Sequence, residues 1–167
     1  TIHTIDVAGK PIAAIIKRET KEDFEAYKLK NQLQNTNLST EERVDITMQA
    51  IAKYRSVLEN DLNNESALLG LVELYSTTPR MDSLLYFVER LIAVCPNENY
   101  LGYAANIYSN LYQATRDQNM LTNIFAIYQK MVNENPYSAQ NYYQLAMLYS
   151  QLGNKNKATS IMEECMQ

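Results

Sequence analysis

The sequence has few of the residues that form turns, bind metals or carry out catalysis. Its 167 residues include four glycines, four prolines, two cysteines, one histidine (His3) and no tryptophan. Sandwiches and barrels need many turn residues, so the shortage of glycine and proline favours helices. The single histidine disfavours a Ser-His-Asp or Cys-His site, and no Gly-rich phosphate loop or Cys-x-x-Cys pattern occurs. We therefore predict that the chain is not an enzyme and has no catalytic residue, metal site or cofactor.

Long apolar segments and an excess of positive charge are also missing. No stretch approaches the ~18 apolar residues of a membrane-spanning helix, and the run Ile12–Ile16 is far too short. The formal net charge of −4 gives a mildly acidic surface, which repels phosphate backbones. We predict no nucleic-acid partner and no membrane insertion in this segment. The sequence begins at Thr1 rather than methionine, so we expect it to belong to a larger protein or assembly.

Residues 1–18 have a different hydrophobic pattern from the rest of the chain. Apolar and polar residues alternate between Thr1 and Val7, Ala8–Pro11 has turn chemistry, and Ile12–Ile16 is rich in β-branched residues. These features are typical of short strands joined by a turn. The sequence therefore predicts a short extended or hairpin arm over residues 1–18, and an interdomain linker is an equal alternative.

From Glu19 onward the apolar residues recur with the period of a helix. Ser39 and Glu42 have the spacing of a capping box at a helix start, and Pro96 and Pro136 mark helix ends. The pattern predicts eight helices, at about residues 20–35, 40–60, 65–75, 81–94, 100–114, 120–132, 142–152 and 158–166.

Two spacings recur along this helical part. A second-helix anchor is followed 12 residues later by a stop position in the pairs Ala50 and Leu62, Leu84 and Pro96, and Ile124 and Pro136. A first-helix residue precedes the second-helix anchor by 16 residues in the pairs Leu68 and Leu84, and Tyr142 and Ala158. The last predicted pair of helices also has Leu145, Ala146, Tyr149, Gly153 and Met162 at the positions that the repeat pattern expects. This order of large, leucine, small and tyrosine positions, followed by a small residue on the second helix, resembles the tetratricopeptide repeat (TPR) family.

The resemblance covers about residues 40–167 and implies an all-α fold. The implied architecture is a right-handed α-solenoid of about three TPR-like helix pairs, preceded by the arm, because a single pair cannot bury its apolar face alone. The repeat domain would span residues 19–167, with a half copy at about 40–64 and copies at about 65–97, 98–138 and 139–167. In the third pair Leu101 and Ile124 are 23 residues apart, which predicts longer helices or a bulged turn near residues 115–119.

The resemblance also implies a binding or scaffolding module with a concave groove lined by the first helix of each pair. A protein or peptide partner would bind there, and a repeat names an architecture rather than a reaction. The matching positions have no lysine or arginine, which disfavours the chaperone C-terminal carboxylates that some family members bind. The groove residues carried over to this chain are Glu73, Asn106, Asn110, Gln113, Gln140, Tyr143, Met147 and Gln151.

The alternative function is a glycan-binding or cell-envelope module of a bacterium. Its basis is the abundance of asparagine and tyrosine, including Tyr100, Tyr103, Tyr112 and Tyr137, whose rings could stack on sugars. Exposed tyrosines on the inner face would favour a glycan, and tyrosines buried between pairs would favour a protein partner. The sequence leaves open a cytoplasmic or a bacterial periplasmic location, and free thiols or one disulfide for the two cysteines.

Overall fold

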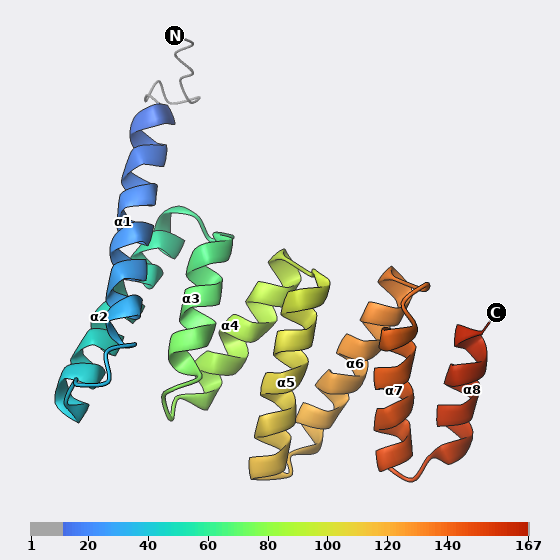
Figure 1. The fold of residues 1–167 in the computed structure, drawn as a ribbon. Helices are drawn as coiled ribbons and strands as arrows, with labels where there is room; N and C mark the ends of the chain where they lie inside the picture. Colours follow the sequence, from blue (N-terminus) through green and yellow to red (C-terminus); the bar gives the residue numbers. More distant parts are fainter. Residues whose placement is uncertain (1–11, 167) are drawn as a thin grey trace. The chain divides into compact units, whose positions relative to one another are not determined.

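The computed structural model of the chain describes the backbone of residues 12–166 and the side chains of residues 21–166. Over these residues the fold is all-helical, which confirms the all-α part of the predicted fold class (Figure 1). The eight helices are α1 (Ile12–Gln32), α2 (Thr40–Asn60), α3 (Glu65–Tyr75), α4 (Met81–Val94), α5 (Glu98–Thr115), α6 (Gln118–Glu134), α7 (Ala139–Gln151) and α8 (Lys155–Cys165).

The first helix begins earlier than the sequence pattern predicts. Because α1 starts at Ile12, the prediction of an extended arm is wrong for residues 12–18, and the rest of the predicted arm, residues 1–11, lies outside the described residues. The three isoleucines of this segment are accompanied by Ala13 and Ala14, which favour helix. Adding turns to a helix that is already formed costs little compared with starting a new one, so the helix continues through a segment with mixed propensity.

The chain divides into two compact units, of which unit 1 ends at Val94 and unit 2 begins at Cys95. In unit 1, α1 packs against α2, α3 packs against α4, and α3 also contacts α2 and α1. The predicted capping box starts α2: the Glu42 backbone N–H donates to Ser39 Oγ at 3.2 Å, and the Ser39 backbone N–H donates to Glu42 Oε2 at 2.8 Å. The core of unit 1 is built from the apolar faces of α2, α3 and α4. Its almost fully buried residues are Tyr54, Val57, Leu68, Leu71, Val72, Tyr75, Val88 and Leu91.

Unit 2 repeats the order of unit 1. The helices α5 and α6 pack together, α7 packs on α8, and α6 also contacts α7. Leu145 and Ala146 of α7 are buried with Ile161 of α8 and Val132 of α6, while Tyr149 is half-buried against the same cluster. These three α7 residues occupy the repeat positions identified in the sequence, and all three face the packed side of the helix.

The third helix pair has the longer helices that its spacing predicts. The helices α5 and α6 contain 18 and 17 residues, whereas α7 and α8 contain 13 and 11. Only Arg116 and Asp117 separate α5 from α6. Arg116 has a left-handed backbone (φ 59°) at the end of α5, and Asp117 accepts a hydrogen bond from the Asn119 N–H at the start of α6. The extra length therefore lies in the helices and not in the connection.

Candidate interaction surface

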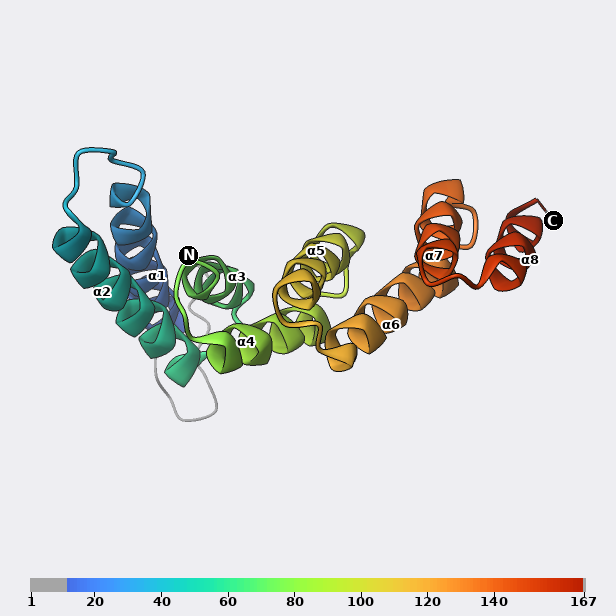
Figure 2. The same cartoon turned by 90° about the horizontal axis from the view of Figure 1, so that it is seen from below.

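Seven of the eight predicted groove residues lie in unit 2, on α5 and α7. In Figure 2 these two helices lie on the same side of α6, which contacts both. The helical period exposes these side chains, because the opposite faces of α5 and α7 are buried. The seven exposed residues are Asn106, Asn110 and Gln113 of α5 and Gln140, Tyr143, Met147 and Gln151 of α7.

The apolar centre of this surface lies on α7. Tyr143 and Met147 are one helical turn apart and are 48% and 40% exposed, although their neighbours Tyr142 and Ala146 are buried. Both exposed side chains line a groove of about 340 Å³ between α7 and α8, together with Ala146, Ser150, Ala158, Thr159 and Met162. We name this the α7–α8 groove. The contribution of α8 was missed by the sequence reasoning, although the spacing of Met162 from the anchor Ala158 could have indicated it.

A buried amide fixes α7 on α6. Asn141 is the one buried polar side chain among the described residues, and its Nδ2 donates a hydrogen bond of 3.1 Å to the backbone oxygen of Met131. An amide of this kind is costly to bury unless it is hydrogen-bonded. The bond therefore specifies where α7 begins relative to the end of α6, and it positions Tyr143 two residues later.

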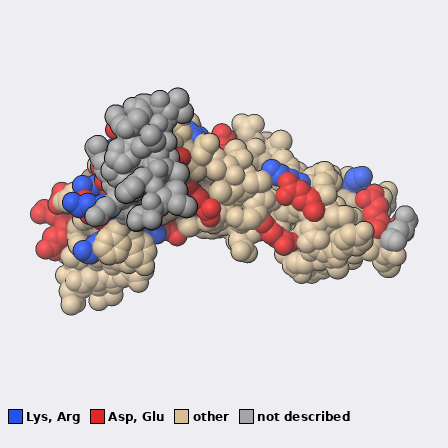
Figure 3. Space-filling view, turned by 90° about the horizontal axis from the view of Figure 1, so that it is seen from above, with Lys and Arg blue, Asp and Glu red and all other residues tan. Residues whose placement is uncertain are grey.

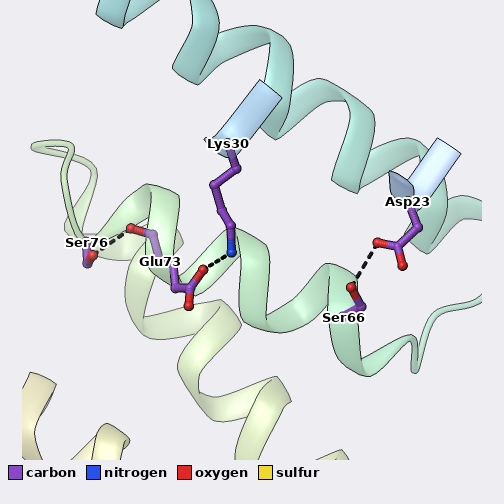
Figure 4. Close-up of polar contacts among 5 residues, drawn as sticks. All are labelled: Asp23, Lys30, Ser66, Glu73 and Ser76. Atoms are coloured by element: carbon purple, nitrogen blue, oxygen red, sulfur yellow. Dashed lines mark hydrogen bonds and ion pairs between the residues drawn. The ribbon is translucent and has the colours of Figure 1, made fainter. Parts of the chain in front are cut away.

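Glu73, the eighth predicted groove residue, lies in unit 1 and has a different environment. Its carboxylate forms an ion pair with Lys30 of α1 (Figure 4). A second contact joins the same two helices, because Ser66 Oγ of α3 donates to Asp23 Oδ1 of α1 at 2.9 Å. Residues of α1 therefore occupy this side of α3, and Glu73 is engaged within the unit.

A second cavity lies in unit 1, at the turn that joins α3 to α4. Its volume is about 510 Å³. Arg43 lines it, and its guanidinium donates hydrogen bonds of 2.7 Å to the backbone oxygens of Leu33 and Asn35, just after the end of α1. The other lining residues are Leu33, Thr40, Val44, Thr47, Met48, Thr77, Thr78, Pro79 and Arg80.

Burial and nearby charge shift the ionisation of two tyrosines. Burial, and then the nearby carboxylates of Asp23 and Glu73, raise the pKa of Tyr54 to about 12. Burial also raises the pKa of Tyr128. Both hydroxyls are therefore neutral at physiological pH. Figure 3 shows acidic and basic side chains interspersed with a larger uncharged surface on the face that it draws.

The tyrosines named for the glycan alternative fall into two groups. Tyr100, Tyr103 and Tyr112 are half-buried along α5. Tyr137, in the turn between α6 and α7, is 97% exposed. With Tyr143, the chain thus offers two accessible rings at the start of α7.

The described part of the chain offers neither a metal centre nor a bilayer-spanning helix. Among the described side chains, residues 21–166, no three His, Cys, Asp or Glu gather as metal ligands would, and no described helix combines the length and apolar character of a bilayer-spanning segment. Cys95 and Cys165 are not joined by a disulfide. His3 lies outside the described residues.

Comparison with known proteins gives distant likenesses only. No protein-family model and no curated protein matches the chain. Among solved structures, TTC0263, a thermophilic TPR protein of Thermus thermophilus, is similar at 20% identity with a TM-score of 0.48, over 86% of this chain and 73% of that one. A human IFIT1 dimer with m7Gppp-AAAA is similar at 14% identity with a TM-score of 0.44, over 86% of this chain and 38% of that one.

Proposed function

We propose that this chain is a non-enzymatic protein-interaction module built as a right-handed TPR-like solenoid. It binds an extended segment of a protein partner along α5 and α7, and it works within a larger protein or assembly. The observation that carries the proposal is the exposed surface of unit 2, where amide side chains of two helices flank the exposed Tyr143 and Met147. We leave Glu73 out of this binding surface because Lys30 already engages it.

The chemistry of this surface suits a peptide backbone. Each asparagine or glutamine offers both a hydrogen-bond donor and an acceptor, which matches the alternating N–H and C=O groups of an extended chain. The ring of Tyr143 provides a flat apolar surface, and Met147 adapts to different side chains because its thioether is flexible. With no charged residue among the seven, we expect modest affinity and little dependence on salt.

Selection from a displayed library of random peptides against the full chain tests this proposal. Peptides that bind should lose about tenfold or more in affinity for the double variant Asn110→Ala/Tyr143→Ala, since a central aromatic side chain typically contributes most at an interface. The matched control is Asn119→Ala/Tyr137→Ala, which removes an exposed amide and an exposed ring outside the surface. Peptides that bind both variants equally well would refute the proposed binding surface along α5 and α7, provided that circular dichroism shows both variants folded.

Glycan binding is the second candidate, and the exposure of Tyr137 and Tyr143 is the observation that favours it. Sugar rings stack on accessible tyrosines, and amides hydrogen-bond their hydroxyls. An oligosaccharide array probed with the full chain separates the two candidates. Binding that Tyr137→Ala or Tyr143→Ala abolishes supports a glycan ligand, whereas an empty array together with selected peptides supports the protein partner.

A further inference from the structure

In unit 2, one row of side chains on α6 is covered by the next helix. Phe125, Tyr128 and Val132 lie one, four and eight residues after the anchor Ile124, and all three pack into the cluster that contains residues of α7. The rings of Phe125 and Tyr149 make a direct contact, with centroids 4.7 Å apart. On α7 the residues of this interface follow the spacing i, i+3 and i+7: they are Tyr142, Leu145 and Tyr149.

The same row occurs in unit 1. Counting one, four and eight residues from the anchor Ala50 of α2 gives Ile51, Tyr54 and Leu58, which are all buried. The helix that follows, α3, packs on α2, and the ring of Tyr54 lies against Gly70 of α3. In both units, therefore, the row is a docking surface for a helix.

On α8 and its C-cap residue Met166 the equivalent row is exposed. The same count from the anchor Ala158 gives Thr159, Met162 and Met166, and the two methionines are 38% and 79% exposed. Thr159 and Met162 line the α7–α8 groove together with Tyr143 and Met147 of α7. Three flexible methionine side chains along this surface can adapt to a partner in a way that a fixed aromatic row cannot.

We propose that the row of Thr159, Met162 and Met166 is a docking site for an amphipathic helix of a partner protein, which packs on α8 as α7 packs on α6. The spacing of the row fixes the chemistry of the partner. Its helix needs apolar side chains at i, i+3 and i+7, as in other helix-in-groove complexes. The helical period places Glu163 on the flank of the row, and because Glu163 is exposed, a basic residue beside the apolar stripe of the partner would complement it.

A partner fits this surface better than a second copy of the chain. The first-helix rows at the spacing i, i+3 and i+7 on α3 and α5 are buried within their own units, and α7 uses its row on α6. The helix α1 exposes Phe24 and Tyr27, but its third position is the polar Asn31, and the amines of Lys28 and Lys30 lie 5.1 and 6.0 Å from the centres of these rings. The first helices α1, α3, α5 and α7 therefore offer no complete exposed apolar row for a second copy.

This inference does not need the peptide-binding surface along α5 and α7 proposed above, although the α7–α8 groove shares Tyr143 and Met147 with it. A synthetic, helix-stapled peptide with the sequence Ala139–Gln151 is the probe, because it carries the Tyr, Leu and Tyr side chains that cover the α6 row. The full chain is labelled with ¹³C on its methionine methyl groups. We expect the peptide to shift the signals of Met147, Met162 and Met166, while those of Met48 and Met81 in unit 1 stay unchanged.

Matched variants decide between the outcomes. Met162→Glu should weaken binding of the stapled peptide by about tenfold or more, because a helix would have to bury the new carboxylate. Asn106→Ala/Asn110→Ala should bind the stapled peptide normally, even if these two residues contribute to the peptide-binding surface along α5 and α7. A peptide with serine in place of its Tyr, Leu and Tyr side chains should not bind. The absence of shifts at millimolar peptide, shifts confined to Met120 and Met131 of α6, or binding that survives Met162→Glu would overturn the proposal. Shifts of Met162 and Met166 that depend only on protein concentration would assign the row to a second copy and overturn it equally.

Discussion

The ring of Tyr54 on α2 lies directly over Gly70 on α3, so close that a methyl group added at Gly70 would stand 2.5 Å from the ring carbons. Both residues are buried, so an added methyl group would press the ring against the packed interior around it. Glycine in a helix interior ordinarily costs stability. Its presence here allows the two helices to approach closely.

Gly70→Ala should therefore destabilise unit 1. We expect a loss of about 1–3 kcal/mol from overpacking, measured by urea unfolding. The matched control is Gly102→Ala on α5, where the added methyl group would meet nothing within 4 Å. That variant should gain roughly 0.5–1 kcal/mol from the better helix propensity of alanine. Equal effects of the two substitutions would show that Tyr54 does not constrain Gly70.

The raised pKa of Tyr54 predicts loss of stability at alkaline pH. Burial and the nearby carboxylates raise its pKa to about 12 in the folded chain, against the ordinary value of 10.0. Between these values the unfolded chain releases the phenolic proton more readily, so stability falls as the pH rises from about 10 towards 12. Tyr54→Phe should flatten this part of the pH profile of urea unfolding, and an unchanged slope would contradict the assignment.

The capping box of α2 predicts a local loss of stability on removal of one hydroxyl. Ser39→Ala should cost about 1 kcal/mol because the Glu42 N–H loses its acceptor. Ser138, at the start of α7, makes no side-chain cap hydrogen bond, so Ser138→Ala is the matched control and should leave the melting temperature nearly unchanged. The hydrogen bond from the Ser39 backbone N–H also lowers the pKa of Glu42. The stabilisation from that carboxylate is present above its ordinary pKa of 4.5 and is lost as the pH falls through its lower, folded-state value.

Much of the fold could be predicted because its signals are local. The spacing of Ser39 and Glu42 identifies the start of α2, and the interval from Leu101 to Ile124 identifies the long helices α5 and α6. The start of α1 could not be predicted, because residues 12–18 have mixed helix and strand propensities. The extension of a helix that is already formed decides in favour of helix. The role of Gly70 could not be predicted either, since it depends on the ring of Tyr54 from another helix.

The candidate surface was predicted less completely for a related reason. Helical period alone indicates that Tyr143 and Met147 face away from the buried side of α7. Period does not reveal which neighbour covers a side chain, so the ion pair of Glu73 with Lys30 and the contribution of α8 to the groove appear only in the structure. Tertiary contacts of long polar side chains are set by helix placement.

Asn141 should connect the stability of unit 2 to its binding surface. Asn141→Ala removes the buried hydrogen bond to the Met131 oxygen and leaves a small void, so we expect a loss of about 1–3 kcal/mol. The neighbouring Gln140 is exposed, and Gln140→Ala should leave stability unchanged. Because the amide of Asn141 holds the start of α7 against α6, its loss should also raise amide hydrogen exchange in α7 more than in α5. Exchange that rises equally in both helices would mean that Asn141 contributes to the global stability of unit 2 and does not position α7.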